Sequence, residues 1–120
     1  MDNELKTALE GYFAAIKADY YRWTTASPAE DEILQQVRND MLKEFNEGLT
    51  FEEGQKYIRI ITRSGSSRSA HSFIVKEDDG KFKKGDILKT AGWKAPAKNR
   101  ARGNIFSTYH INWEGADYLR

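Results

Sequence analysis

Basic and aromatic residues within 81–113 are the side chains of this sequence best suited to do chemistry. Eight lysines and arginines fall within 81–104 against a single acid, Asp86, and five aromatic residues are interleaved through 81–113. Basic side chains neutralise phosphates, and aromatic rings stack on nucleobases. Proteins that bind single-stranded nucleic acid use both kinds of side chain. The pattern therefore predicts a surface that binds an anionic ligand, either nucleic acid or a nucleotide.

Trp93 is the aromatic residue most open to a ligand role. We expect Phe82, Phe106 and Trp113 to fill a small β core, because aromatic rings bury the most area there. Trp93 instead falls in a long basic loop, 90–104, where it is either a plug on the core or an exposed platform. The residues predicted to bind the ligand are Trp93, Lys94, Lys98, Arg100, Arg102, Lys89, Arg63 and Arg68.

Arg63 and Arg68 flank a run of small residues, Ser-Gly-Ser-Ser, that allows two interpretations. In the first, backbone amides and the two guanidinium groups hold a phosphate. In the second, the run is a flexible hairpin loop. The strands predicted on both sides favour the hairpin, because a specific phosphate loop leads from a strand into a helix.

Catalysis and metal binding find little support in the residue pattern. The chain has no cysteine, which excludes disulfides, thiolate metal sites and a cysteine nucleophile. Phosphate-loop, dinucleotide, zinc-protease and serine-hydrolase motifs do not occur. His71 and His110 could join a carboxylate at a metal, but two unrelated histidines are the favoured interpretation, and Asp78-Asp79 leads directly into a turn. We expect no enzymatic activity, no metal and no cofactor.

The net charge of +1 conceals two oppositely charged halves. Residues 1–53 hold twelve acids and five bases, a net charge of −7, whereas residues 54–120 hold six acids and fourteen bases, a net charge of +8. Such asymmetry indicates an anionic partner for the basic half, but it also arises when two halves attract each other within the fold. Acidic helices lying over the bases of 81–104 would favour the second explanation.

Two helices are predicted in the acidic half. Apolar residues recur every three or four positions over 3–22, with a cap at Asp2 or Asn3. The second helix is predicted to begin with Ser27 as its N-cap and Pro28 as its first residue. A short connection makes the pair an antiparallel hairpin. The buried stripe of the second helix is predicted to be Ile33, Leu34, Val37, Met41, Leu42 and Phe45.

Short strands are predicted in the basic half. Residue alternation and turn signals place them at 56–62, 69–76, 81–83, 86–89, 104–106 and 109–113. The predicted class is α+β, a single domain over residues 1–120. In it, an N-terminal antiparallel helical hairpin (1–50) packs on a small, strongly bent antiparallel β-sheet or barrel of five to six strands (51–120).

The run FKKGDILKTAGWKAPAKNRARGNIF (82–106) and the closing NWEGADYL (112–119) are distinctive. They resemble a recurrent family of small hypothetical proteins of tailed bacteriophages, including marine ones, and of metagenomic sequences. The likeness lies mainly over residues 56–120. It implies an accessory protein that works in the cytoplasm of an infected bacterium, and it transfers no catalytic or binding residue.

A small, non-enzymatic protein that binds nucleic acid or a nucleotide is the favoured function. The alternative is a protein-binding module that modulates a host or phage protein through its acidic helices, or dimerises through Tyr20, Tyr21 and Trp23. The pattern fits a monomer or a homodimer. No apolar run approaches the ~20 residues of a membrane span and no signal sequence follows Met1, so we expect a cytoplasmic protein without membrane contact.

Overall fold

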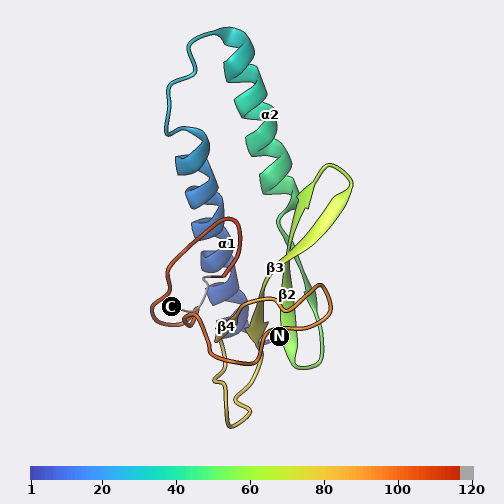
Figure 1. The fold of residues 1–120 in the computed structure, drawn as a ribbon. Helices are drawn as coiled ribbons and strands as arrows, with labels where there is room; N and C mark the ends of the chain where they lie inside the picture. The colour runs from blue at the N-terminus through green and yellow to red at the C-terminus, as the bar shows by residue number, and fades with distance from the viewer. Residues whose placement is uncertain (117–120) are drawn as a thin grey trace.

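Two helices followed by four strands make up residues 1–116, the part of the chain that this computed structural model describes (Figure 1). The elements are α1 (Asn3–Thr24), α2 (Glu32–Gly48), β1 (Thr50–Glu53), β2 (Tyr57–Ser64), β3 (Ser67–Val75) and β4 (Ile87–Leu88). The strands form one open antiparallel sheet in the order β1-β2-β3-β4. The predicted α+β class is confirmed, whereas five to six strands and a closed barrel are wrong. The last four residues of the predicted β unit, 117–120, lie outside the described part.

Both helices begin at an aspartate N-cap. α1 starts as predicted, because the Asp2 carboxylate accepts a hydrogen bond of 2.8 Å from the Leu5 amide. α2 starts later than predicted: Asp31 is its cap, and Ser27 and Pro28 belong to the connection. Asp31 therefore caps α2 in place of the predicted Ser27. Neither helix, within residues 1–116, combines the length and apolarity needed to cross a bilayer.

Three predicted strands are absent, because side chains bind the amides of 81–83 and because 104–106 and 109–113 form only isolated bridges. At 81–83, the Asp79 carboxylate accepts bonds from the amides of two following residues, at 3.1 and 2.7 Å. At 104–106, the Asn104 side chain accepts from the Phe106 amide and donates to the Lys84 carbonyl. Only an isolated bridge joins Gly103 to Tyr109 where 109–113 was predicted as a strand.

The two faces of the sheet have different neighbours, and the basic segment, residues 81–104, contributes β4 to the sheet itself. Residue alternation turns one face, the helix face, toward α1; its buried side chains are Ile58, Ile60, Ile74 and Ile87. The other face, the loop face, carries Phe73, Val75 and Leu88 and is covered by Phe82 of the basic segment. Phe82 and α1 therefore lie on opposite sides of the sheet, although Lys84 of the basic segment reaches Asp2 at the start of α1.

Two of the three predicted core aromatics do not fill the β core. Phe82 is buried as predicted. Phe106 is exposed, and its ring lies over Gly85, where an added Cβ would stand 2.5 Å from it. Trp113 is half-buried and packs against Tyr20 and Phe45 of the helices.

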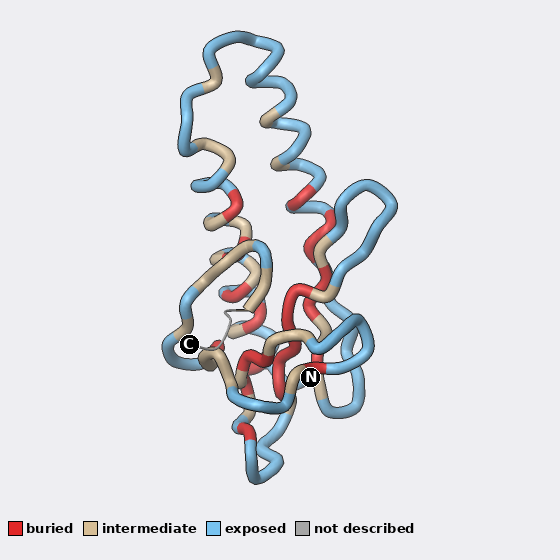
Figure 2. The backbone as a smooth tube through the Cα atoms, in the orientation of Figure 1, coloured by how far each residue is buried: buried red, intermediate tan, exposed pale blue. Residues whose placement is uncertain are grey.

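The helical hairpin extends well past the sheet. Its end far from the sheet, residues 21–41, is called here the hairpin tip, and it is mostly exposed, whereas the end beside the sheet is buried (Figures 1 and 2). The molecule is accordingly elongated, 53 × 30 × 27 Å. The predicted buried stripe of α2 is thus mostly wrong: Phe45 is buried and Leu42 half-buried. The remaining members, Ile33, Leu34, Val37 and Met41, are exposed because no strand reaches them.

Candidate nucleic-acid interface

Trp93 lies on the loop face in contact with two arginines. The guanidinium carbons of Arg59 and Arg68 stand 4.6 and 5.1 Å from the centre of the Trp93 ring. Arg59 also donates a hydrogen bond of 2.8 Å to the Trp93 carbonyl oxygen. Both arginines pair with one carboxylate, Glu52, at 3.0 and 3.3 Å. These four residues, Glu52, Arg59, Arg68 and Trp93, are called the Trp93 cluster.

Strand register and a tight loop bring the cluster together. Glu52 of β1 pairs with Arg59 of β2, so both side chains stand on one face of the sheet. Thr90 bridges to Pro96, and the Ala91 amide donates to the Ala95 carbonyl at 3.0 Å, so that Trp93 falls at the tip of a small hairpin. Trp93 as a whole residue is 37% exposed. Trp93 is therefore both anchored to the sheet and open to solvent.

The cluster carries an excess of positive charge. The hydrogen bond from Arg68, supported by the one from Arg59, lowers the pKa of Glu52 below its ordinary value. One ionised carboxylate then faces two guanidinium groups, which leaves a net charge of +1 beside an exposed aromatic ring. Guanidinium groups bind phosphate oxygens with good geometry, and the ring offers a stacking surface.

The other predicted residues fall into two groups. Lys94 and Arg100 are exposed and, within residues 1–116, form no ion pair. Lys98 stands 5.9 Å from the ring of Tyr57 on the same face, and Arg102 donates to the Arg100 carbonyl. Lys94 follows Trp93 directly in the chain, and Arg102 lies next to β4, where its amide donates to the Ile87 carbonyl at 2.8 Å.

Lys89 and Arg63 belong to different surroundings. Lys89 donates to the Ala116 carbonyl oxygen at 3.0 Å, close to His71. Arg63 lines a cleft of about 440 Å³ between α2 and the β2-β3 hairpin, beside Glu44 and Trp113. Contacts thus place three of the eight predicted residues, Trp93, Arg68 and Lys98, on the loop face. The structure adds Arg59, which the sequence did not single out because its partner Glu52 lies on a strand that was not predicted.

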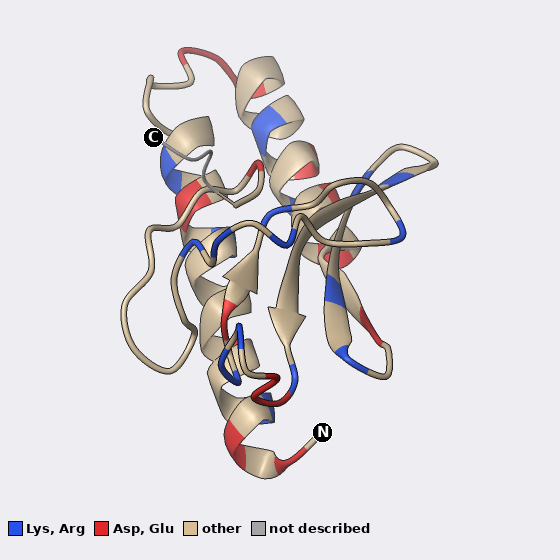
Figure 3. Ribbon diagram, turned by 60° about the horizontal axis from the view of Figure 1, so that its bottom comes forward, with Lys and Arg blue, Asp and Glu red and all other residues tan. Residues whose placement is uncertain are grey.

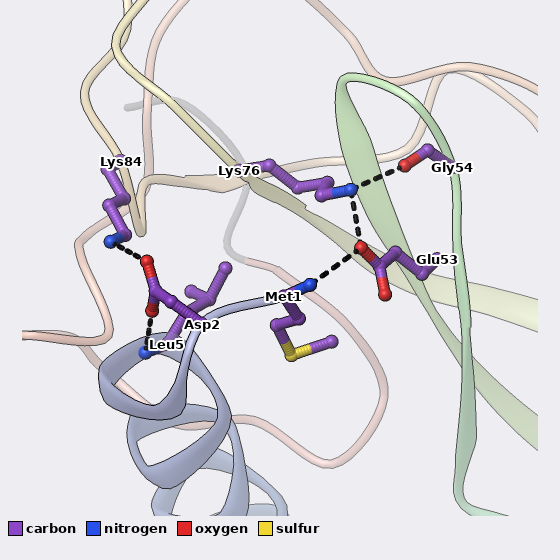
Figure 4. A network of polar contacts seen from close by, with 7 residues as sticks. All are labelled: Met1, Asp2, Leu5, Glu53, Gly54, Lys76 and Lys84. Carbon is purple, nitrogen blue, oxygen red and sulfur yellow. Dashed lines mark hydrogen bonds and ion pairs between the residues drawn. The ribbon is translucent and has the colours of Figure 1, made fainter.

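Acids of the first half do pair with bases of the second, but they are not the acids of the helices. Figure 4 shows Glu53 accepting from the Met1 amine at 3.2 Å and from Lys76 at 2.5 Å, and Asp2 paired with Lys84. In Figure 3 most of the other acidic positions lie in the helices and their connection, and Glu4 of α1 also lies near enough to help raise the pKa of Lys84. Part of the charge asymmetry is therefore internal, and the bases around Trp93 are left uncovered by the helices.

A sequence profile of the family of unknown function DUF7717 matches residues 2–118. The chain belongs to this family. No curated protein and no solved structure matches the chain. The DUF7717 match includes the helices, the sheet and the whole basic segment, so the Trp93 cluster and the hairpin tip both lie within the family's extent.

His71 serves the interior of this DUF7717 fold. Its Nε2 donates to the Asn112 carbonyl at 2.8 Å, so its Nδ1 accepts from the Ser72 hydroxyl at 2.8 Å, and that oxygen bonds the Tyr12 hydroxyl at 2.9 Å. A β-bulge between Ile60 and Ile61 leaves His71 without a register partner and turns it to the helix face beside Ser72. Burial lowers the pKa of His71, which keeps the ring neutral. No cluster of three metal-ligating residues occurs within residues 1–116.

Proposed function

We propose that this protein binds single-stranded nucleic acid on the loop face of its sheet, without catalysing a reaction. The observation that carries the proposal is the exposed Trp93 ring held between the sheet and solvent beside Arg59 and Arg68. Stacking of a base on such a ring contributes about 1–3 kcal/mol. The neighbouring bases would neutralise phosphates along the strand.

The spread of the bases favours a strand over a single nucleotide. Lys94, Lys98 and Arg100 are exposed along one stretch of chain that follows Trp93. Several separate phosphates suit this arrangement better than the clustered phosphates of one nucleotide, which are bound by convergent groups. Glu52 would hold the two arginines in position and, by its charge, discourage a ligand from displacing them.

A tailed-phage origin is part of the proposal and rests on the sequence likeness of residues 56–120 described above. Its consequence is that the ligand would be found in the cytoplasm of an infected bacterium. Single-stranded DNA and RNA both occur there, so both belong in the binding assay.

Fluorescence anisotropy of a labelled fifteen-nucleotide oligothymidylate tests the proposal with the full chain. We expect binding at 50 mM salt that weakens roughly tenfold or more at 200 mM, because released counterions oppose binding. The double variant Lys94→Gln/Arg100→Gln should lower the slope of log affinity against log salt by about 1.4. Trp93→Ala should weaken binding at both salt concentrations.

A matched variant distinguishes binding at a specific surface from attraction by the overall charge of the protein. Lys6→Gln/Lys43→Gln removes the same two charges from exposed positions on the helices and should leave affinity unchanged. Equal losses in both double variants would show adventitious charge attraction and overturn the proposal, as would absence of binding at 50 mM salt. Competition by ATP at concentrations matching the oligonucleotide would identify a nucleotide site instead.

A further inference from the structure

The hairpin tip exposes a row of large apolar side chains. Their exposed fractions are 53% for Trp23, 76% for Ile33, 51% for Leu34 and 50% for Val37. Soluble proteins rarely leave so many large apolar groups open on one side of one element without a partner that covers them. The apolar stripe of α2 was predicted to pack against the rest of the fold. Over the first half of the helix it is exposed to solvent instead.

The exposed row borders a groove between the two helices. A hollow of about 420 Å³ is lined by Trp23 from α1, Pro28 from the connection, and Leu34, Val37 and Met41 from α2. It adjoins the cleft of about 440 Å³ nearer the sheet, since Trp23 and Met41 line both. From Leu34 to Phe45 the groove follows α2 for about 16 Å. That length suits three turns of a third helix, with anchors at positions i, i+3 or i+4, and i+7.

Charge around the groove selects the kind of occupant. Residues 30–48 hold six acids and two bases, a net charge of −4; one of the bases, Arg38, lines the hollow, where it donates to the Ser27 carbonyl oxygen. At about 100° per residue, Asp40, Glu44 and Glu47 fall beside Ile33 and so border the apolar stripe along one side. A second copy would present the same acidic hairpin, and an anionic lipid surface would also be repelled. Lysines or arginines flanking an apolar stripe would meet opposite charges here.

We propose that the groove of the hairpin tip binds a basic amphipathic α-helix of a partner protein. Apolar side chains of that helix enter between Trp23 and Val37, and its basic side chains face Asp40 and Glu47. The site lies on the far side of the sheet from the Trp93 cluster, so this interaction does not depend on nucleic-acid binding.

A designed peptide tests the proposal against the full chain. The probe is a labelled eighteen-residue peptide of leucine and lysine, with leucines spaced i, i+3, i+4 and i+7 and lysines elsewhere, followed by anisotropy at 150 mM salt. One control peptide has the same composition with leucines at alternating positions, and another has glutamate in place of lysine. We expect binding of the first peptide and at least tenfold weaker binding of both controls.

Protein variants locate the binding to the groove. Val37→Gln/Met41→Gln removes apolar contacts at exposed positions and should weaken binding at least tenfold, and Leu34→Gln serves as a second variant of the same groove. Asn39→Ala/Asn46→Ala changes exposed polar positions on the same helix and should bind as the unaltered chain does. The Lys94→Gln/Arg100→Gln chain should also bind the peptide normally, even if nucleic-acid binding proves absent.

Three results would overturn the proposal. The first is no binding of the leucine-lysine peptide, and the second is equal binding of all three peptides. The third is a dimer in sedimentation that Val37→Gln/Met41→Gln converts to a monomer, because a second copy would then occupy the groove.

Discussion

The base and the tip of the helical hairpin carry the same kind of apolar stripe but have different surroundings. At the base, Leu5, Leu9 and Ile16 of α1 are buried against the helix face of the sheet. At the tip, the apolar side chains of α2 repeat at the same spacing and are exposed. The difference shows that helical periodicity identifies which face is apolar, while the reach of the neighbouring sheet decides whether that face is buried within the chain.

The largest expected difference between base and tip is in the cost of removing an apolar side chain. Ile16→Ala, at a fully buried position, should lower the free energy of unfolding by about 2–5 kcal/mol through lost contacts and a cavity. Ile33→Ala, at a position 76% exposed, should change it by no more than about 0.5 kcal/mol. Urea denaturation measures both. Equal losses would mean that the tip is covered in solution and would break the comparison.

The buried network at the base should make stability depend on pH. Burial lowers the pKa of His71 below its ordinary 6.5, so as pH falls below 6.5 the unfolded chain takes up a proton that the folded chain refuses. The free energy of unfolding should therefore decline, by up to about 1.4 kcal/mol per pH unit. Denaturation at pH 7.5, 6.5 and 5.5 measures this decline.

Variants assign that pH dependence to one ring. His71→Asn should be less stable at pH 7.5, because it loses the bonds to Ser72 and Asn112, but should show a smaller decline toward pH 5.5. His110→Gln, at an exposed position, should keep the full decline. An unchanged slope in His71→Asn would show that other groups control it.

Local patterns predicted the elements that depend on local chemistry. α1, the hairpin of β2 and β3 and the short β4 were predicted from periodicity, a Gly-containing turn and apolar residues. β1 was not, because Thr-Phe-Glu-Glu has exposed side chains throughout and becomes a strand only by pairing with β2. The strand predicted at 81–83 is absent because the Asp79 carboxylate binds the amides of Lys81 and Phe82, and 104–106 and 109–113 form isolated bridges in place of strands.

Two of the four residues of the Trp93 cluster, Glu52 and Arg59, could likewise not be predicted from the sequence. Residue types alone showed the basic composition around Trp93. They also showed that Trp93 would either pack on the core or be exposed to a ligand. Arg59 and Glu52 meet only through the β1-β2 register, and the inward turn of His71 depends on a bulge one residue long. A one-residue change in pairing moves a side chain to the other face of a sheet, so composition alone cannot place it.

The start of α2 offers a smaller test, confined to the tip. The Asp31 carboxylate accepts from the Leu34 amide at 2.8 Å, so Asp31→Ala should destabilise the first turn by about 1 kcal/mol. Ser27→Ala should have little effect, because only the Ser27 carbonyl is used, as an acceptor for Arg38. Amide hydrogen exchange of residues 34–36 measures both. Faster exchange in Ser27→Ala and not in Asp31→Ala would show that Ser27 is the N-cap of α2, as the sequence pattern predicted.

The smallest expected effect concerns the ion pairs that tie the N-terminus to the sheet at the base. The hydrogen bond from Lys76, together with that from the Met1 amine, lowers the pKa of Glu53 below its ordinary 4.5. Because the folded chain holds this carboxylate ionised to lower pH than the unfolded chain does, the stabilisation is complete above pH 4.5 and is lost as pH falls through the folded pKa. Solvent screens these exposed groups, so the change should be slight.

Thermal unfolding between pH 6 and 3 should resolve that small contribution. Glu53→Gln should melt at a slightly lower temperature than the unaltered chain at pH 6. This difference in melting temperature should shrink as pH approaches 3. Glu47→Gln removes an exposed carboxylate of α2 that has no ion pair within residues 1–116 and should run parallel to the unaltered chain throughout. A gap that stays constant for Glu53→Gln would mean that Lys76 and Met1 contribute nothing through this carboxylate. The base would then depend on its apolar contacts, the His71 network and the ion pair of Asp2 with Lys84.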